Sequence, residues 1–369
     1  MSLIRMTIAL AGALALAAAC GSKDDGKGPV GKPGTDEGGG SGGSAGELTG
    51  AGATFPYPLY SKWMHSYNQK TGIEINYQSI GSGGGIKQIT ARTVDFGASD
   101  APMKDDELAA APGKIVHIPM TLGAVVVAYN LDGLSGPLRL TPATVAGIFL
   151  GDIKKWNDAK LAADNPGARL PDKEIAAVYR SDGSGTTAVF TDYLAKISPA
   201  WKDKVGAGKS VKFPVGMGAK GNEGVAGQVK TTPGAVGYIE LAYAKQTGQP
   251  YAHLENADGQ FVDASEEAIT AAAAATAKDI PDDYRVSITS APGAASYPIS
   301  AFTYILVYED AKDAGKGRAL ADFLWWAIHD GQDMGPPLHY AKLPAELVTK
   351  IEATIKGLKA GGQPALAGK

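Results

Sequence analysis

The feature that most constrains the fold is a glycine-bearing turn between a strand-like run and a helix-like run. Residues 175–179 form a short apolar run that predicts a buried strand, and residues 189–194 carry apolar side chains at helical spacing. Between them, residues 180–187 have the sequence Arg-Ser-Asp-Gly-Ser-Gly-Thr-Thr. Backbone N–H groups and the positive end of the helix dipole meet at such a turn. The segment therefore predicts an anion site, although a loop of this kind can also simply cap its helix.

The side chains of this turn suit the same chemistry. Hydroxyl groups can donate from Ser184, Thr186 and Thr187. The planar guanidinium of Arg180 can hold an oxyanion through two parallel hydrogen bonds. Asp182 either orients this arginine through a side-chain pair or stabilises its own turn.

Two further loops are of the same kind. Residues 50–58 precede apolar residues spaced four apart, which predicts a helix that begins near the first proline of this segment. Thr54 is then the expected N-cap, and the N–H of Phe55 is expected to point outward. Residues 79–85 follow an alternating strand pattern and place Ser82 near the start of another helix. Three such loops on one chain favour a single shared anion.

Residues 94–100 predict a short strand that ends in an acid. If Asp100 joined the anion site, its carboxylate would repel a fully ionised ligand such as sulfate. Hydrogenphosphate keeps a proton and could donate it to this carboxylate, whereas the wrong ligand would leave a buried acceptor unpaired. The alternative is that Asp100 caps a helix over residues 103–111, and this stretch alone does not separate the two interpretations.

Catalytic and cofactor motifs are not completed in this chain. The glycine-rich run at residues 81–85 comes close to the Gly-x-Gly-x-x-Gly fingerprint without completing it, and Ser184 does not lie in a Gly-x-Ser-x-Gly nucleophile elbow. The five histidines are scattered, and no His/Asp/Glu cluster has metal-ligand spacing. We therefore predict a binding protein with no catalytic residues, no metal and no cofactor. A phosphatase that uses Ser184 would have no visible base.

Four motifs occur in an order that resembles a known family. They are Gly-Ala-Gly-Ala-Thr-Phe-Pro at 50–56, Gly-Ser-Gly-Gly-Gly at 81–85, Asp-Phe-Gly-Ala-Ser-Asp-Ala-Pro at 95–102 and Asp-Gly-Ser-Gly-Thr at 182–186. The chain closely resembles the periplasmic phosphate-binding protein of the high-affinity phosphate ABC importer. The resemblance begins at about residue 48 and continues to near the C-terminus.

This resemblance implies roles for individual residues. The positions that match phosphate ligands are all present: Thr54, Phe55, Ser82, Asp100, Arg180, Ser184, Gly185 and Thr186. Phe55 would donate its backbone N–H, and the turn that contains Gly185 would supply hydroxyl and N–H contacts. Arg180 would be the one charged donor, with Asp182 as its supporting partner. Asp100 would accept the proton of the ligand and so reject sulfate.

The order of elements predicts an α/β fold, with strands expected at residues 73–80, 115–119 and 175–179 and helices between them. An amphipathic helix is expected around residues 319–327, and an Ala/Glu-rich surface helix or insertion at residues 264–278. Three of the tryptophans are expected in the core: Trp63, Trp156 and Trp201.

The resemblance further implies a two-lobed periplasmic binding protein fold of type II, with two mixed-sheet lobes joined by two crossover strands. The apolar runs at residues 123–129 and 299–308 are the candidates for the crossovers. Lobe I would then comprise residues 48–122 plus 301–369, and lobe II residues 123–300. Phosphate would bridge the cleft and favour closure, because only the closed form has both sets of contacts.

Residues 1–19 have the pattern of an export signal, in which Arg5 precedes an apolar run too short to span a bilayer as a mature helix. The run ends at Cys20, the only cysteine, where we expect cleavage and lipidation. The aliphatic residue of the usual lipobox lies at Leu16, one position too far from the cysteine, and ordinary signal cleavage is the alternative. Residues 20–47 would be a lipid anchor and flexible Gly/Ser-rich linker with a reach of roughly 25–30 Å.

The expected partners follow from the charge and from the resemblance. The net charge is −3 and no long basic run occurs, which argues against nucleic acid. The resemblance implies inorganic phosphate as ligand and the membrane permease and ATPase subunits of a phosphate ABC transporter as partners. We expect an exported monomer, periplasmic or at the cell surface, held at the membrane by its lipid. Two alternatives stay open: a binder of another tetrahedral oxyanion, which Asp100 argues against, and a surface phosphate sensor or scavenger.

Overall fold

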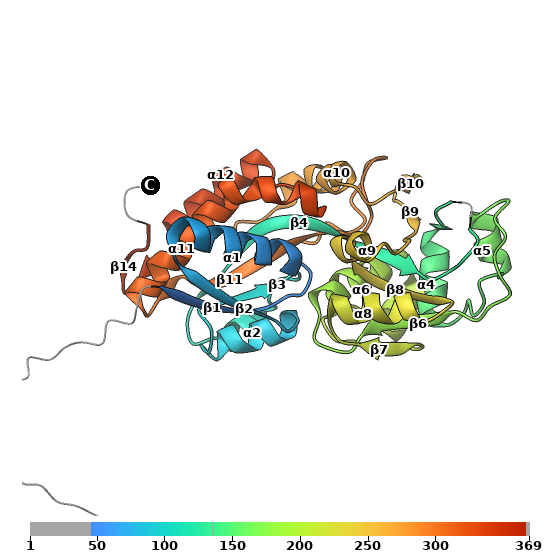
Figure 1. Cartoon of the computed structure of the whole chain (residues 1–369), viewed down its shortest axis with the longest axis horizontal. Coiled ribbons are helices and arrows are strands. Elements are labelled where there is room, and N and C mark those ends of the chain that lie inside the picture. Colours follow the sequence, from blue (N-terminus) through green and yellow to red (C-terminus); the bar gives the residue numbers. More distant parts are fainter. Residues whose placement is uncertain (1–45, 135, 367–369) are drawn as a thin grey trace, which may run out of the picture. The chain divides into compact units, whose positions relative to one another are not determined.

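An eight-stranded mixed sheet, in the order β2-β1-β3-β11-β4-β8-β6-β7, organises the chain (Figure 1). The computed structural model describes residues 46–134 and 136–366. β1 runs parallel to β2 and β3, and β6 runs parallel to β7 and β8, whereas β4 and β11 are antiparallel to their neighbours. The strands are β1 (Glu47–Gly52), β2 (Glu74–Ser79), β3 (Phe96–Ser99), β4 (Ile115–Tyr129), β6 (Ala176–Arg180), β7 (Met217–Ala219), β8 (Ala235–Glu240) and β11 (Ser300–Tyr308).

The strand β4 belongs to both ends of this sheet. Its residues 115–124 pair with β11, and its residues 125–129 pair with β8. The sequence predicted two separate strands here, and this prediction is wrong, because a single strand continues through the proline. Pro119 lies at a shift of register with β11, and a bulge of this kind tolerates a residue that has no N–H to donate.

Two small sheets and a set of helices complete the fold. One small sheet contains β5 (Arg139–Leu140), β9 (His253–Glu255) and β10 (Phe261–Val262). The other contains β12 (Asp310–Ala311), β13 (Lys359–Ala360) and β14 (Gln363–Pro364). The helices are α1 (Tyr57–Thr71), α2 (Ser82–Thr90), α3 (Asp105–Ala109), α4 (Pro142–Leu150), α5 (Ala159–Asp164), α6 (Gly185–Ile197), α7 (Pro199–Lys204), α8 (Gly221–Thr231), α9 (Leu241–Thr247), α10 (Glu266–Thr276), α11 (Ala314–Ile328) and α12 (Ala345–Lys356). Short 3₁₀ turns lie at Ala277–Asp279, Asp330–Met334 and Pro336–Leu338.

The helix starts test the capping predictions. Helix α1 has Pro56 at its N-cap and no side-chain cap, so the prediction that Thr54 caps it is wrong. The Thr54 hydroxyl instead accepts hydrogen bonds from Asn222. Helix α3 begins after Lys104, which excludes Asp100 as its cap. Helix α6 is capped by Ser184, whose Oγ accepts from the N–H of Thr187 at 3.0 Å.

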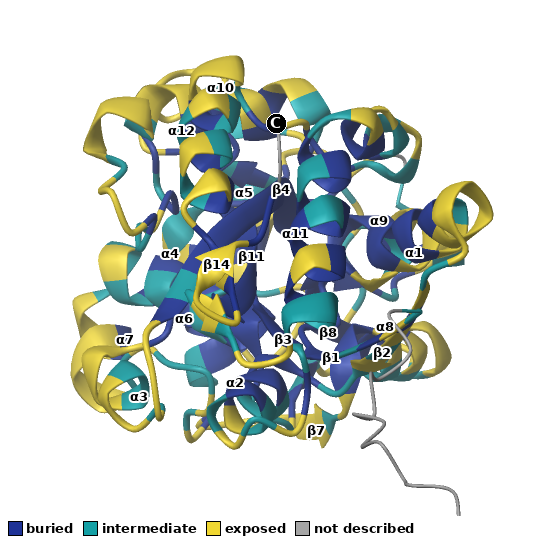
Figure 2. Cartoon of the chain, turned by 90° about the vertical axis from the view of Figure 1, so that its left-hand side faces the viewer, coloured by how far each residue is buried: buried dark blue, intermediate teal, exposed yellow. Residues whose placement is uncertain are grey.

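The core surrounds the central strands, and Figure 2 shows β4 and β11 buried beneath helices with exposed outer faces. The prediction of three core tryptophans is confirmed: Trp63, Trp156 and Trp201 are fully buried, and each donates its indole N–H to a backbone carbonyl. The helices expected at residues 264–278 and 319–327 are α10 and α11. In α10 the side chains of Ile269 and Ala272 are buried, so this helix contributes to the core.

The predicted signal peptide and Cys20 lie outside the described residues. Among residues 46–134 and 136–366, no helix has the combination of length and apolar character that crossing a membrane requires. The predicted lobe boundaries fall at Gly123, inside β4, and at Ser300, the first residue of β11.

Candidate functional site

The predicted anion loops meet beyond the carboxyl ends of parallel strands. Thr54 follows β1, Ser82 follows β2 and Asp100 follows β3, while residues 181–187 follow β6. In open α/β sheets, ligands bind at such strand ends. Hydrogen bonds join the loops directly. The N–H of Gly185 donates to Ser82 Oγ at 3.0 Å, the N–H of Gly83 donates to the Gly183 carbonyl at 2.8 Å, and the N–H of Gly81 donates to the Gly52 carbonyl at 2.8 Å.

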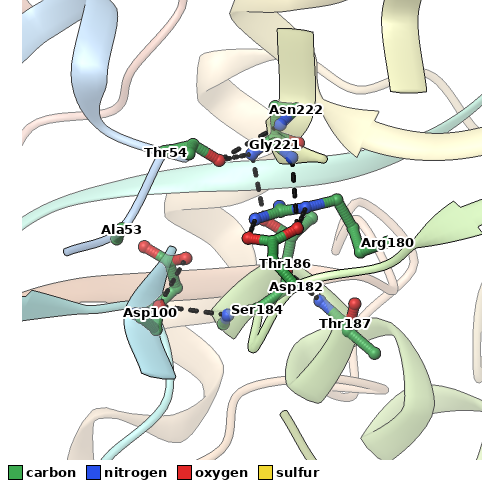
Figure 3. Close-up of polar contacts among 12 residues, drawn as sticks. Ala53, Thr54, Asp100, Arg180, Asp182, Ser184, Thr186, Thr187, Gly221 and Asn222 are labelled. Carbon is green, nitrogen blue, oxygen red and sulfur yellow. Dashed lines mark hydrogen bonds and ion pairs between the residues drawn. The ribbon is translucent and has the colours of Figure 1, made fainter. Parts of the chain in front are cut away.

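The guanidinium of Arg180 is held by Asp182 in a two-pronged ion pair (Figure 3). Nε donates to Oδ1 at 2.8 Å and Nη2 donates to Oδ2 at 2.6 Å. Nη1 is directed to the hydroxyl of Thr186 at 3.3 Å. Partial burial raises the pKa of Asp182, but the hydrogen bonds and charge of Arg180 outweigh it, and the net pKa is lowered. The pair therefore stays ionised, and the direction of the arginine is fixed.

Asp100 lies in very different surroundings. Its side chain is almost fully buried, and Oδ1 accepts a hydrogen bond from the Thr303 hydroxyl at 2.9 Å. Oδ2 lies 3.4 Å from Ser82 Oγ. Burial raises the pKa of Asp100 to about 7, against the opposing effects of Thr303, the charge of Arg180 and the hydroxyl of Ser82. This carboxyl can therefore gain or lose a proton near neutral pH.

Gly185 occupies a position that leaves no room for a side chain. A Cβ at this residue would overlap Asp100 Oδ2 and Ser82 Oγ. The absence of a side chain lets the first turn of α6 come directly against the carboxyl and the hydroxyl. Its N–H and the N–H of Asp100 both donate to Ser82 Oγ, the latter at 3.3 Å.

Thr54 and Phe55 are held through their backbone carbonyls. The hydroxyl of Tyr243 donates to the Thr54 carbonyl at 2.5 Å, and the hydroxyl of Tyr340 donates to the Phe55 carbonyl at 2.7 Å. The Phe55 side chain is fully buried. The structure thus brings together all eight residues predicted as ligands, together with Asp182, around one buried cluster.

Sequence reasoning missed three residues of this cluster. Asn222 is fully buried and donates to both Thr54 and Thr186. Thr303 supports Asp100, and its signal was a polar residue inside the apolar run at residues 299–308. Glu240 is fully buried, and burial raises its pKa well above the usual range, which favours its uncharged form. Asn222 follows the very short strand β7, which the sequence pattern did not reveal.

A cavity of about 340 Å³ borders Asp100. Its lining residues come from both ends of the large sheet and include Met103, Val189 and Ile288. Within the part of the chain that the structure describes, no group of three or more His, Cys, Asp and Glu residues could hold a metal ion.

Comparison with known proteins decides the family. The family model of the PBP superfamily domain matches residues 38–330. The phosphate-binding protein PstS of Xylella fastidiosa strain 9a5c is 50% identical over 308 residues, which cover 83% of this chain and 84% of that protein. This chain belongs to the PstS family. The PstS of Methanocaldococcus jannaschii is 38% identical over 332 residues, which cover 82% of this chain and 85% of that protein.

Membership of the PstS family confirms the resemblance predicted from the motifs and makes the chain a binding protein rather than an enzyme. A solved structure of the phosphate-binding protein from Stenotrophomonas maltophilia is similar with a TM-score of 0.64, over 83% of this chain and 93% of that one. At 20% identity this likeness shows the fold. The predicted mixed α/β fold of the periplasmic binding proteins is therefore confirmed.

Proposed function

We propose that this chain binds inorganic phosphate at the cluster around Arg180 and delivers it to a phosphate ABC importer. The observation that carries the proposal is the pairing of one fixed cation with one buried, titratable carboxyl among hydroxyl and N–H donors. A buried anion needs compensating charge and hydrogen bonds, and this cluster supplies both. The relatives named phosphate-binding protein PstS support the choice of ligand.

Each predicted residue has a role in this proposal. Arg180 supplies charge, held in place by Asp182. Hydrogen-bond donors surround the anion: the hydroxyls of Thr54, Ser82, Ser184 and Thr186 and the backbone N–H groups of Phe55 and Gly185. Because Ser82 Oγ and the Gly185 N–H are bonded to each other, phosphate would have to replace this contact with contacts to itself.

Asp100 would separate phosphate from sulfate. When it is ionised, its carboxylate accepts the proton of hydrogenphosphate and repels sulfate, which has no proton to give. Its pKa of about 7 means that a substantial fraction is ionised at neutral pH, and a proton-bearing ligand would stabilise the ionised form further. The buried position makes an unpaired charge costly, which sharpens the discrimination.

We further propose that the two ends of the sheet move as the predicted lobes, residues 48–122 plus 301–369 and residues 123–300. The contacts that cross the proposed boundary around the site are polar, and this supports a movement of the two lobes relative to each other. Lys209 pairs with Glu107 at 2.7 Å, and Asn222 reaches Thr54. Small-angle scattering should show a smaller radius of gyration with phosphate than without it. An unchanged radius would argue against closure.

We propose that the chain is exported and anchored, as a monomer, through a lipid on Cys20. The support is the signal-like residues 1–19 and the single cysteine at their end. Labelling of cells with radioactive palmitate should mark the wild-type chain and leave Cys20→Ser unlabelled. Equal labelling of both would exclude this anchor.

Calorimetric titration of the purified protein tests the central proposal, after carried-over ligand has been removed. Phosphate and arsenate should bind tightly with a stoichiometry of one, and sulfate should bind far more weakly at pH 8, where most of Asp100 is ionised. Sulfate binding as tight as phosphate binding at pH 8 would remove Asp100 from the site. If phosphate, arsenate and sulfate all fail to bind, the proposed function is overturned. A transport assay with the permease and ATPase would separate an importer from a sensor.

A further inference from the structure

Asn222 lies at the start of α8 and contacts two of the proposed phosphate donors from one amide group. Its side chain is fully buried. Nδ2 donates to Thr54 Oγ1 at 2.8 Å and to Thr186 Oγ1 at 3.1 Å. The backbone N–H of Asn222 also donates to Thr54 Oγ1, at 3.2 Å.

The orientation of this amide follows from its third contact. The backbone N–H of Glu240 donates to an amide atom of Asn222 at 2.9 Å, and that atom must be the oxygen Oδ1. The NH₂ group therefore faces the two threonines. Both of its hydrogens are used, one for each hydroxyl, so the amide has no freedom to turn over.

The consequence concerns the hydroxyl hydrogens. A threonine hydroxyl has two acceptor positions and one hydrogen. Thr54 Oγ1 accepts from two N–H groups of Asn222, and Thr186 Oγ1 accepts from Asn222 and from Arg180 Nη1. With both acceptor positions engaged, each hydroxyl can only donate its hydrogen. The two threonine hydroxyls are therefore set to donate their hydrogens to an anion whose facing oxygens act only as hydrogen-bond acceptors.

We infer that Asn222 is a positioning residue of the phosphate site, which sets the hydroxyls of Thr54 and Thr186 as hydrogen-bond donors to the anion. The inference rests on the proposed function, and it assigns Asn222 no direct contact with the ligand. The amide joins residues that follow β1 and β6, so it also links the two proposed lobes.

If Asn222 is a positioning residue, its loss should weaken phosphate binding through its effect on the two threonine hydroxyls. Asn222→Ala should weaken phosphate binding by about a hundredfold, because it frees the hydroxyls of Thr54 and Thr186 from their set direction and each of their hydrogen bonds to the anion accounts for roughly tenfold. Thr186→Val and Thr54→Val should each weaken it by about tenfold. The matched control is Asn165→Ala, because Asn165 is also buried but bonds to Arg139 and Leu161, away from the site. This control should lower the melting temperature and leave phosphate affinity unchanged.

Double variants separate positioning from a general structural role. If Asn222 acts through the hydroxyls, Asn222→Ala combined with Thr186→Val should bind about as weakly as Asn222→Ala alone, and the same should hold with Thr54→Val. Losses that multiply would overturn the inference. Coupling to Thr54 alone would also overturn it, because it would indicate only a link between lobes.

Calorimetry with phosphate on each folded variant gives these ratios, and circular dichroism reports folding. If Asn222→Ala does not fold, Asn222→Asp fills the same volume but cannot donate, and it should lose at least a hundredfold. Wild-type affinity in Asn222→Asp would overturn the inference. Failure of the wild-type protein to bind phosphate is a different result, which would overturn the proposed function itself.

Discussion

Asp100 and Asp182 are two carboxyl groups of one site, and their surroundings shift their pKa values in opposite directions. Asp182 is paired with Arg180 by two hydrogen bonds, and its pKa is lowered. Asp100 is more deeply buried, with hydroxyls rather than a cation as its direct partners, and its pKa rises to about 7. Burial raises the pKa of both groups, so the opposite outcomes come from the deeper burial of Asp100 and from the cation in direct contact with Asp182.

In the proposed function, this difference separates two tasks of a phosphate site. Attraction of an anion needs a charge that does not change with pH, and Asp182 secures this by fixing the Arg180 guanidinium. Selection between anions needs a group that can respond to the ligand's proton, and of these two carboxyls Asp100 is the one whose pKa lies near neutrality. Substitutions or changes of pH that remove or alter one side of this contrast should therefore have different effects on binding.

The largest effect is expected from Arg180→Met. This change removes the fixed cation and leaves Asp182 without its partner in a partly buried position. Each charge-assisted hydrogen bond that the anion loses accounts for about 1.5–3 kcal/mol, so the loss of two should lower the phosphate affinity about a thousandfold in calorimetry. The unpaired Asp182 should in addition lower the stability of the fold. Arg285→Met is the control, because Arg285 pairs with Asp105 and Asp283 near the surface, and affinity should change less than twofold. A loss below tenfold in Arg180→Met would contradict the assigned role.

Asp100→Asn should produce the next largest effect, on selectivity and on stability. Without the carboxylate, sulfate should bind, and the preference for phosphate should fall by about a hundredfold. The folded-state pKa of Asp100 lies above the unfolded value, so its contribution to stability is complete below pH 4 and is lost as pH rises through 7. The full shift corresponds to about 4 kcal/mol.

The amide that replaces the Asp100 carboxyl in this variant also needs partners, so the net gain in the free energy of unfolding at pH 8 should be about 2 kcal/mol. The difference between variant and wild type should shrink as pH falls toward 4. Denaturant unfolding at several pH values measures it. A difference that is constant with pH would show that Asp100 is ionised in the folded protein at all these pH values.

A smaller effect is expected for sulfate binding to the wild-type protein as pH changes. When Asp100 is protonated, it can donate a hydrogen bond to sulfate instead of repelling it. Sulfate affinity should therefore rise by about tenfold between pH 8 and pH 6, since the proton-bound fraction rises by about this factor around a pKa near 7. In Asp100→Asn the same titration should be flat. A pH-independent wild type would assign the selectivity to another group.

The parts of this site that the sequence predicted all lie in short local motifs. Residues 180–187 contain the cation, its partner and three donors within one strand-turn-helix unit, and local spacing was enough to find them. The α/β order and the core tryptophans followed from periodicity and size. Local signals of this kind do not depend on how distant segments meet.

The parts that the sequence did not predict depend on contacts between distant segments. Thr54 was expected to cap α1, but its hydroxyl meets Asn222, which is 168 residues away in the chain. The two strands expected around Pro119 are one strand, because pairing with β11 accommodates the proline at a bulge. Thr303 supports Asp100 across 203 residues and had no motif around it. Such contacts are determined by strand order, which periodicity alone does not give.

The smallest effect, and the most specific, is expected from Thr303→Val. The change keeps the shape of the side chain and removes the hydroxyl that stabilises ionised Asp100 at 2.9 Å. Loss of one such hydrogen bond should raise the pKa of Asp100 by about one unit. Thr121→Val is the matched control, since Thr121 pairs with Thr303 in the sheet but donates to the Ala341 carbonyl. NMR titration of the Asp100 carboxyl should show the upward shift in Thr303→Val only. An unchanged pKa would mean that the Thr303 hydroxyl has no part in setting the pKa of Asp100, and so none in the contrast between Asp100 and Asp182.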